Sequence, residues 1–578
     1  MKNYLNKLYY YLKRKFNKRK HDDEEPINMH LEYPDISLYE LIENTANKYP
    51  NNIAYEYYGH VVTYKDFIKK IKTTASALKK IGVKKKDRVT ICMPNTPSAV
   101  ITFYAINMVG ATANMIHPLS SENEILMYLQ MAKSKYLLVI DMDYEKICNI
   151  MDKTELERII VSIPNEEMTN TKKALYWFFT GRKNKIKRNP NTMLFKEFYH
   201  LGNPNEDNLL TPASADEEAV ILYSGGTTGE PKGIVLSNRN FNAEAIECEV
   251  MCKTAKEGDS ILSIMPIFHA FGLGICIHTI FYIGMKAILI PTFNAKKFGS
   301  LIKKYHPNFI IGVPTLFEAL LKNNNLKKND LSCVTCVISG GDNLSSSLKE
   351  KVDEFLKTHG SKAQVREGYG LTECVGASCL TPYNKYKEKS IGLPLPDITY
   401  KIVKPTTHDE VERGIDGEIC INGPTVMMGY LDDPKETSNV LRIHDDGKLW
   451  LHTGDLGCMD SEGFVYFKQR LKRIIVSSGY NIYPSHVENI INSHPLVLTS
   501  TVIGIDHPYK VQVAKAYIVL KENVKPNYTT KKSIKEHCIK NLAKYSLPYE
   551  YVFIDELPKT KIGKIAYKKL EQDALKKE

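Results

Sequence analysis

The amino-acid sequence predicts an α/β fold in which a large N-terminal domain precedes a small α+β C-terminal domain. The chain has 578 residues, of which 43% are hydrophobic and 25% charged, an ordinary globular composition that excludes fibrous and wholly disordered proteins. Apolar runs alternate with helical patterns: a Gly/Thr loop follows Ala219–Tyr223, and Ser339-Gly340-Gly341 follows Cys333–Ile338. Such alternation favours α/β layers with mainly parallel sheets.

The domain boundary is predicted at a charged stretch near residue 471. Arg470–Arg473 separates two strand-like runs, Gly463–Phe467 and Ile474–Ser477. We therefore assign residues 27–471 to the N-terminal domain and residues 472–578 to the C-terminal domain, leaving 1–26 as a separate basic segment. The C-terminal piece, of about 100 residues, is long enough for a small domain with its own core.

The net charge of +12 is concentrated in two short segments. Residues 1–20 carry eight basic residues and no acid, and residues 170–190 carry seven more and no acid. The rest of the chain is therefore close to neutral, at about −3, which argues against a general nucleic-acid binder.

Both basic segments also carry hydrophobic and aromatic side chains. Residues 1–20 place apolar side chains at helical spacing, and residues 170–190 include Tyr176, Trp177, Phe178 and Phe179. Basic amphipathic helices and interfacial aromatics are typical of peripheral membrane contact, which we predict for both segments. The alternative is a solvated tail and a surface loop. A further uncharged run, Ser260–Met285, contains a proline, two histidines and three glycines, and is predicted to be buried core rather than a membrane span.

The 12 cysteines are expected to be reduced. The N-terminus lacks the apolar core of roughly 7–15 residues that a secretory signal peptide needs, which favours a cytoplasmic location. Cys333 and Cys336 form a Cys-x-x-Cys pair, but a strand over this run would put them on opposite faces. No second pair at zinc spacing follows, so neither a metal nor a redox role is expected for this pair.

The clearest candidate site is the glycine-rich segment Tyr223–Gly233. Glycines let the backbone approach a ligand, while free N–H groups and hydroxyls can surround phosphate oxygens. Lys232 adds a positive charge. The spacing differs from that of the common P-loop, and a glycine-rich surface turn is the alternative. The candidate phosphate-binding residues are Ser224, Gly225, Gly226, Thr227, Thr228, Gly229 and Lys232.

Six motifs occur along the chain in one order: Tyr223–Gly233, Pro266-Ile-Phe-His-Ala270, Gly368-Tyr-Gly-Leu-Thr-Glu373, His452-Thr-Gly-Asp-Leu-Gly457, Arg470-Leu-Lys472 and Leu557-Pro-Lys-Thr-Lys-Ile-Gly-Lys564. Together they resemble the adenylate-forming superfamily of acyl-CoA synthetases, peptide-synthetase adenylation domains and luciferases. The resemblance runs from about Leu38 to Leu570. It implies a large N-terminal domain of layered sheets and helices with a small mobile α+β C-terminal domain.

The resemblance implies a two-step reaction that uses ATP, Mg²⁺ and CoA. A carboxylate attacks the α-phosphorus of ATP to give an acyl-adenylate and pyrophosphate, and the thiol of CoA then displaces AMP. In the family, Lys564 would lie between the carboxylate and the α-phosphate, Thr372 would contact phosphate, and Glu373 would help to bind Mg²⁺. His269 would gate or line the acyl site, although a lone histidine in an apolar run is more often a hydrogen-bonded core residue.

The resemblance also assigns residues to the nucleotide and to the thiol. Tyr369 would stack on adenine, in a pocket lined by Gly340, Gly341 and Asp342, and Gly370 is a further nucleotide-binding candidate. Asp455 would accept hydrogen bonds from the ribose hydroxyls, and Arg470 would contact ribose and phosphate. Lys472 matches the hinge about which the small domain rotates between the two half-reactions, and Gly479 matches the glycine beside the pantetheine tunnel.

Three positions depart from the family pattern near the expected thiol site. His486 stands where glutamate is usual, Val511-Gln512 where Gly-Glu is common, and Ala566-Tyr567 where an arginine is often found. These departures affect the geometry expected around CoA and leave the catalytic residues in place.

The acid is predicted to be a medium- or long-chain fatty acid. Neither tryptophan of the chain lies in the acyl-site motifs, and the residues after Glu373, Cys374–Ser378, are small. With Gly312 and Gly340 they would leave a roomy apolar pocket. The alternatives are an adenylation enzyme that loads a carrier protein, a ligase for an aryl or other carboxylate, and a non-catalytic nucleotide-binding scaffold.

Overall fold

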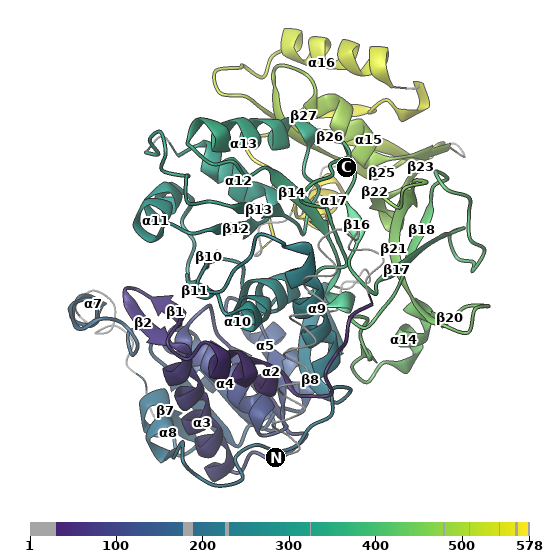
Figure 1. The fold of residues 1–578 in the computed structure, drawn as a ribbon. Helices are drawn as coiled ribbons and strands as arrows, with labels where there is room; N and C mark the ends of the chain where they lie inside the picture. Colours follow the sequence, from purple (N-terminus) through teal and green to yellow (C-terminus); the bar gives the residue numbers. More distant parts are fainter. Residues whose placement is uncertain are drawn as a thin grey trace.

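A computed structural model describes residues 30–176, 178, 186, 189–225, 231–323, 325–477, 480–507, 509–542, 544–560 and 565–575. Two large sheets with helices around them make up most of the N-terminal domain (Figure 1). A five-stranded sheet follows them, and a second five-stranded sheet belongs to the C-terminal domain. The predicted α/β fold, with a large N-terminal and a smaller C-terminal domain, is confirmed.

The eight-stranded sheet has the order β19-β9-β8-β4-β3-β5-β6-β7. Its strands β3 to β8 pair in parallel, while β8, β9 and β19 pair antiparallel at one edge. The bounds are β3 (Arg88–Cys92), β4 (Thr112–Met115), β5 (Tyr136–Ile140), β6 (Arg158–Ser162), β7 (Thr192–Leu194), β8 (Glu218–Gly225), β9 (Pro231–Ser237) and β19 (Gly429–Tyr430).

The nine-stranded sheet has the order β16-β15-β14-β13-β12-β10-β11-β1-β2. Its interior strands, from β14 to β1, are parallel, and antiparallel strands close both edges. The bounds are β1 (Ile53–Tyr57), β2 (His60–Thr63), β10 (Ser260–Ser263), β11 (Lys286–Leu289), β12 (Phe309–Gly312), β13 (Cys336–Ser339), β14 (Val365–Tyr369), β15 (Cys379–Leu380) and β16 (Leu393–Pro394). The predicted mainly parallel pairing therefore holds for the interiors of both large sheets.

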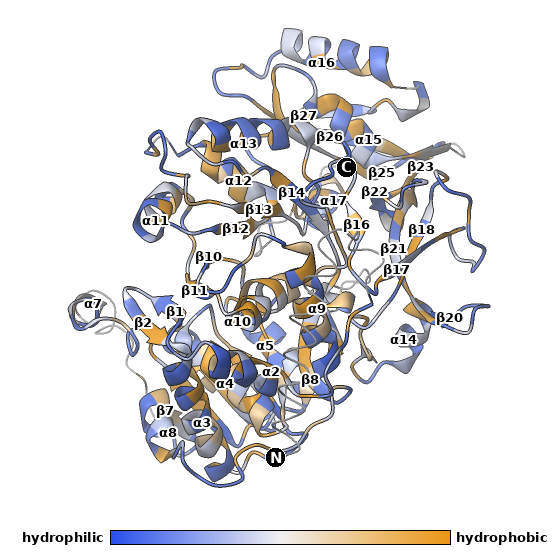
Figure 2. Cartoon of the chain, viewed as in Figure 1, coloured by the Kyte–Doolittle hydropathy of each residue, from blue (hydrophilic) through white to orange (hydrophobic). Residues whose placement is uncertain are grey.

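Helix α4 shows how the core of the large domain forms. Its sequence from Pro97 to Met108 contains no charged residue, and every residue of the helix is buried. A helix that is apolar all round is suited to the interior between layers. The hydrophobic colour gathers in the same way on α10 and its neighbours in the middle of the domain (Figure 2).

The helices of the large domain are α2 (Leu38–Lys48), α3 (Tyr64–Lys80), α4 (Pro97–Met108), α5 (Glu122–Ala132), α6 (Tyr144–Ile150), α7 (Asn170–Tyr176), α8 (Phe195–Leu201), α9 (Asn238–Met251), α10 (Ile280–Ile283), α11 (Phe298–Tyr305), α12 (Pro314–Leu321), α13 (Ser346–Thr358) and α14 (Pro434–Val440). Several begin with a side chain that caps the first free N–H groups. Ser37 and Ser121, for example, form capping boxes with Glu40 and Glu124.

The uncharged run Ser260–Met285 is buried core, as predicted. It forms β10, the π-helix η5 (Phe271–Thr279) and α10, and η5 packs against α9. Gly272 is needed inside η5, because a Cβ there would lie 2.0 Å from the carbonyl oxygen of Pro266. In the part of the chain that the structure describes, no helix is long and apolar enough to cross a membrane.

The third sheet is antiparallel and joins the two domains. Its strands are β17 (Thr399–Val403), β18 (Gly417–Asn422), β20 (Leu441–Ile443), β21 (Leu449–Met459) and β22 (Val465–Arg470). After β22 the chain makes one 3-10 turn, η8 (Leu471–Arg473), and enters the C-terminal sheet at β23. Figure 1 shows β21 and β22 next to the start of that domain.

The C-terminal domain has its own hydrophobic core. Strands β23, β24, β25 and β26 pair antiparallel, and β27 adds to β26 in parallel. The bounds are β23 (Ile475–Ser477), β24 (Tyr480–Ile482), α15 (Pro484–Asn492), β25 (Val497–His507), β26 (Val511–Leu520), α16 (Tyr528–Asn541), β27 (Glu550–Phe553) and α17 (Tyr567–Leu575).

The prediction of one strand over Cys333–Ile338 was wrong at its start. β13 begins at Cys336, and Cys333 lies in the preceding turn. The two cysteines therefore do not share a strand. Cys336 instead faces Cys252, whose pKa is lowered to about 7 by the hydrogen bond with Cys336 and by the charge of Arg366.

Candidate functional site

The candidate site begins where two parallel strands end. β13 ends at Ser339 and leads into Gly340-Gly341, and β14 ends at Tyr369 and leads into Gly370. Gly341 has φ +77°, a left-handed conformation that suits glycine. Ligands of open α/β sheets bind outside the carboxyl ends of the strands. The structure therefore places the two predicted glycine turns side by side at the expected edge.

Tyr369, Asp455 and Arg470 form one contact group. The hydroxyl of Tyr369 donates to Oδ2 of Asp455 at 2.7 Å, and Arg470 Nε lies 3.4 Å from Oδ1 of the same carboxylate. Asp455 on β21 and Arg470 on β22 are cross-strand partners, which explains their proximity. The negative charge of Asp455 raises the pKa of Arg470. The fold thus brings three candidate nucleotide-binding residues together, and their roles stay predictions.

Thr372 and Glu373 lie in a short 3-10 turn, η7 (Thr372–Cys374). Tyr430 donates a hydrogen bond of 3.1 Å to Glu373 Oε1, and the backbone N–H of Met427 donates to the carbonyl of Glu373 at 2.9 Å. The turn ends at Val375, whose φ of +65° is unusual for a β-branched residue. Tyr430 therefore holds the Glu373 carboxylate, and Met427 holds the backbone of the same residue, beside a strained turn.

The two described ends of the glycine-rich segment pair as antiparallel strands. β8 and β9 place Tyr223 opposite Gly233, Ser224 opposite Lys232 and Gly225 opposite Pro231. Lys232 Nζ forms an ion pair with Glu436 of α14 and lies 4.9 Å from the ring centroid of Tyr430. Because Tyr430 also bonds Glu373, the Lys232 side chain lies in the same neighbourhood as the Thr372–Glu373 turn.

His269 lies at the entrance to the π-helix η5. Its carbonyl accepts the N–H of Leu273 at 2.8 Å, and its ring packs against Phe268 at 5.1 Å. A Cβ built on Gly376 would lie 3.3 Å from the carbonyl carbon of Ala270, the next residue. The His269 segment therefore packs against the turn that follows Glu373, although its contact with an acid stays a prediction.

Glu244 is a residue of this region that the sequence did not single out. It lies on α9 with a fully buried side chain, and its Oε1 accepts the backbone N–H of Ala377 at 2.7 Å. A Cβ on Gly274 would lie 2.1 Å from Oε2, so a side chain there would force the Glu244 carboxyl to move. Burial raises the pKa of Glu244 well above its usual range. An isolated glutamate in a mixed helix gives no sequence signal for such a role.

Three glycines among the small residues that predicted a roomy acyl pocket have side chains close to their Cβ positions. The ring of Phe271 lies 3.4 Å from a Cβ built on Gly340, and Leu316 lies 2.3 Å from one built on Gly312. The Glu244 carboxyl lies 3.1 Å from one built on Gly376. Side chains from η5, α12 and α9 therefore lie directly beside these three glycines.

Several predicted site residues lie outside the described residues. They are Gly226, Thr227, Thr228, Gly229, Gly479 and Lys564. Lys472 belongs to the turn η8 between the last strand of the third sheet and β23. The roles suggested for these seven residues stay predictions.

The domain junction contains a side-chain cluster that includes Tyr567, one of the positions that depart from the family pattern. Arg473 forms an ion pair of 2.7 Å with Glu488, and its guanidinium lies 4.0 Å from the ring centroid of Tyr567. Its Nη1 also donates to the Tyr567 hydroxyl at 3.2 Å. Tyr567, which stands where the family often has an arginine, thus packs on an arginine of η8.

The donors at the strand ends fit a nucleotide with a divalent cation. The buried Oγ of Ser339 has no hydrogen-bond partner among the described residues, and it directly precedes Gly340. Gly454, beside Asp455, has no atom within 4 Å of its Cβ position. Glu373 and neighbouring hydroxyls are oxygen ligands of the kind that Mg²⁺ prefers. An unsatisfied hydroxyl, open space beside Asp455 and a carboxylate thus meet at one edge.

Comparison with known proteins agrees with this geometry. The model of the AMP-binding enzyme family matches residues 42–431, and that of the AMP-binding enzyme C-terminal domain matches residues 486–564. A long-chain-fatty-acid–CoA ligase of Bacillus subtilis is 33% identical over 551 residues, covering 94% of this chain and 95% of the relative. One from Escherichia coli O157:H7 is 29% identical, covering 93% and 94%.

Solved structures show the same fold. ATP-bound MatB from Rhodopseudomonas palustris superposes with a TM-score of 0.81 at 23% identity, covering 93% of this chain and 99% of that one. A long-chain-fatty-acid–CoA ligase from Archaeoglobus fulgidus gives a TM-score of 0.69 at 24% identity, covering 92% and 99%. With both domains matched in order, the chain belongs to the AMP-binding enzyme family.

Proposed function

We propose that this protein is a fatty acid–CoA ligase that forms AMP. The observation that carries the proposal is the 33% identity to a long-chain-fatty-acid–CoA ligase over nearly the full length of both chains. The contact group of Asp455, Tyr369 and Arg470 supplies groups that activation of an acid by ATP requires. Glu373 follows Tyr369 by four residues.

The first half-reaction joins the acid to AMP. A carboxylate oxygen of the fatty acid attacks the α-phosphorus of ATP, the bond to the β-phosphate bridge oxygen breaks, and pyrophosphate leaves. Asp455 accepts hydrogen bonds from the ribose hydroxyls, while Arg470 offsets negative charge beside it. Glu373 would hold Mg²⁺, which neutralises phosphate charge when bound. Lys564 is proposed to stabilise the charge that develops between the carboxylate and the α-phosphate.

The second half-reaction transfers the acyl group. The CoA thiol gives up its proton to solvent, its sulfur attacks the acyl carbon, the carbon–oxygen bond to the phosphate breaks, and AMP leaves with both electrons of that bond. The C-terminal domain is proposed to turn about Lys472 between the two steps, as the family resemblance implies. The cluster of Arg473, Glu488 and Tyr567 would then lie close to the moving junction.

The decisive experiment measures pyrophosphate release with ATP and Mg²⁺ across straight-chain acids of increasing length, with and without CoA. A maximum at medium or long chains with thioester formed supports the proposal. Adenylate formed without thioester would point to a carrier protein as acceptor, and activity with aryl acids alone would reassign the substrate. No release with any acid would contradict the proposal.

A matched pair of lysine variants tests the role of Lys564. Lys564→Ala is expected to lower the rate of adenylate formation by about 100-fold or more, the usual scale for removing one electrostatic group at a reacting centre. Lys561→Ala removes the same charge three residues earlier in the segment and is the control. Equal losses in both variants would contradict a specific role for Lys564.

We also propose that residues 1–20 bind anionic membrane surfaces, where a fatty acid substrate partitions. Eight basic residues beside apolar side chains at helical spacing support this. The second basic segment is a weaker candidate, because Lys172 donates a 2.6 Å hydrogen bond to the carbonyl of Tyr58 and so already contacts the protein.

Vesicle sedimentation tests the membrane proposal. The full chain should bind vesicles that contain anionic lipid and lose most binding when residues 1–20 are removed. Changing Leu5, Leu8 and Leu12 to serine keeps every charge and should weaken binding as well. Unchanged binding after the deletion would contradict the proposal.

A further inference from the structure

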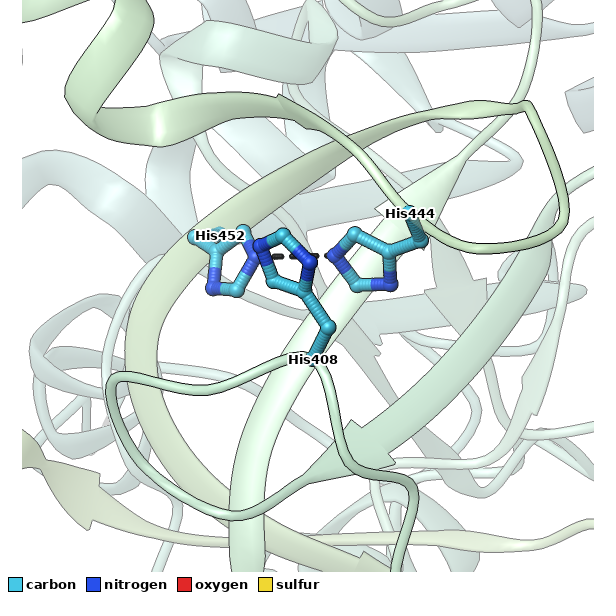
Figure 3. Close-up of side chains that lie close together, drawn as sticks. All are labelled: His408, His444 and His452. Carbon is cyan, nitrogen blue, oxygen red and sulfur yellow. Dashed lines mark hydrogen bonds between the residues drawn. The ribbon is translucent and has the colours of Figure 1, made fainter.

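Three histidines from separate segments meet on one side of the third sheet (Figure 3). His408 lies in the loop after β17, His444 directly follows β20, and His452 lies on β21. One ring nitrogen from each histidine lies within 4.8 Å of the corresponding nitrogens of the other two. None of the three belongs to the contact group of Tyr369, Asp455 and Arg470. Imidazole is a common ligand for divalent transition metals.

The hydrogen bonds of His452 fix which of its nitrogens faces the cluster. Its Nδ1 lies 3.0 Å from Oε2 of Glu418, and a carboxylate can only accept, so Nδ1 carries the proton. Nε2 then holds a lone pair and points to His444. A carboxylate that orients a histidine in this way is the usual outer partner of a metal-bound imidazole.

His444 offers the second nitrogen from a buried position. Its side chain is 4% exposed, and its Nε2 lies 2.9 Å from Nε2 of His452 (Figure 3). Its Nδ1 is buried without a hydrogen-bond partner in the described part of the chain. In the absence of a metal the two rings share one proton between their Nε2 atoms. A metal would replace that proton and leave His444 Nδ1 as a donor.

The distances are near those of a mononuclear zinc site. Nitrogens bound to one tetrahedral Zn²⁺ at about 2.0–2.1 Å are about 3.4 Å apart, so His444 and His452 need only a small separation. His408 has further to move, because its ring is stacked on His444 at 4.4 Å and must rotate to aim a nitrogen inward. Its exposed position in a loop permits that rotation.

The surrounding charges suit a cation. Glu418 brings a buried negative charge next to His452, and its other oxygen accepts the N–H of Gly454 at 3.0 Å. Two cations are near: Lys401, which is paired with Asp446 at 2.7 Å, and Arg442, whose charge acts on Glu418. The site therefore combines three imidazoles with one oriented carboxylate.

We propose that His408, His444 and His452 bind a divalent transition metal, with Zn²⁺ as the fitting ion and water completing its coordination. Three protein ligands and an exposed third histidine leave a position open to solvent. The bound ion would join the loop after β17 to β20 and β21, and so would stabilise the third sheet. The proposal is independent of the reaction that the enzyme performs.

Titration of the full chain with Co²⁺, a spectroscopic substitute for Zn²⁺, tests the proposal. The wild type should give the visible absorption of tetrahedral cobalt without thiolate charge-transfer bands, and Zn²⁺ should displace it at a stoichiometry of one. His408→Asn removes one ligand from an exposed loop and should weaken Co²⁺ binding about tenfold or more. His200→Asn, an exposed histidine outside the cluster, is the matched control and should bind as the wild type does.

A second readout guards against an unspecific effect of the substitution. Zn²⁺ should raise the midpoint of thermal unfolding of the wild type and of His200→Asn, but not that of His408→Asn, because a ligand stabilises only the state that binds it. Glu418→Gln should weaken Co²⁺ binding about 10- to 100-fold through the orientation of His452. Equal Co²⁺ affinity in all variants, thiolate bands, or no binding to the wild type would overturn the proposal.

Discussion

Tyr369 at the end of β14 donates a 2.7 Å hydrogen bond to Asp455 on β21, and this contact links the nine-stranded sheet to the third sheet. The carboxylate also faces Arg470 from the neighbouring strand. Asp455, the residue proposed to hold the ribose, is therefore positioned by Tyr369 of β14 and by Arg470 of β22. Substitutions in this group should affect ATP more than the acid.

Replacing Tyr369 separates the ring from its hydroxyl. Tyr369→Ala removes the surface proposed to stack on adenine and should raise KM for ATP about tenfold or more, since stacking of a base on an aromatic ring contributes about 1–3 kcal/mol. Tyr369→Phe keeps the ring and should stay within about threefold of the wild type. Steady-state rates at saturating acid and CoA give both values. Equal losses would show that the hydroxyl, not the ring, matters.

Replacing Asp455 by Asn should lower kcat/KM for ATP by about 100-fold. The change removes the proposed ribose acceptor and leaves the Arg470 charge without its partner, a loss of about 3 kcal/mol for a charged hydrogen-bonded group. Asp416→Asn is the control, since Asp416 is half-exposed and pairs loosely with Lys468 at 3.9 Å. The prediction fails if both variants behave alike or if only the KM of the acid changes.

Replacing Glu373 by Gln should raise the Mg²⁺ concentration that gives half-maximal rate by about tenfold or more, because one ionised oxygen ligand is lost. Tyr430→Phe, which removes only the 3.1 Å hydrogen bond to Glu373, should have a smaller effect in the same direction. Initial rates across a Mg²⁺ series at fixed ATP measure the shift. An unchanged Mg²⁺ requirement would exclude Glu373 as a ligand.

Glu244 should make stability depend on pH. Burial raises the pKa of its carboxyl in the folded state, so the folded protein keeps a proton that the unfolded chain loses above about pH 4.5. The wild type should therefore lose stability as pH rises from about 4.5 towards the folded pKa, by up to about 1.4 kcal/mol per pH unit from this group. Glu247, also buried with a raised pKa, contributes in the same direction.

Glu244→Gln removes the ionisation and keeps an acceptor for the Ala377 N–H. The free energy of unfolding of the variant minus that of the wild type should be larger at pH 7 than at pH 5. Urea unfolding of both proteins at the two pH values measures this difference. Parallel pH dependence in the two proteins would mean that the Glu244 carboxyl is ionised in the folded state.

The sequence predicted the parts of the site that lie in continuous motifs. Asp455 and Arg470 stood in recognisable segments, and strand pairing then placed them opposite each other. Glu244 could not be predicted, because its contacts come from η5 and from the turn after Glu373. His408, His444 and His452 gave no signal of a metal site either, since their spacing matches no metal motif and only the sheet brings them together. The start of β13 was misplaced because an apolar run does not show where a turn ends.

The short connection η8 has a consequence for how the two domains meet. β22 and β23 are separated by four residues, which are the three of η8 (Leu471–Arg473) and Ile474. Fully extended, a segment of this length spans only about 10–14 Å. In any orientation the small domain therefore stays tethered within a few residues of Arg470, at an effective local concentration in the millimolar range or above. For the role proposed for Lys564, weak and reversible contacts with the large domain would therefore be sufficient.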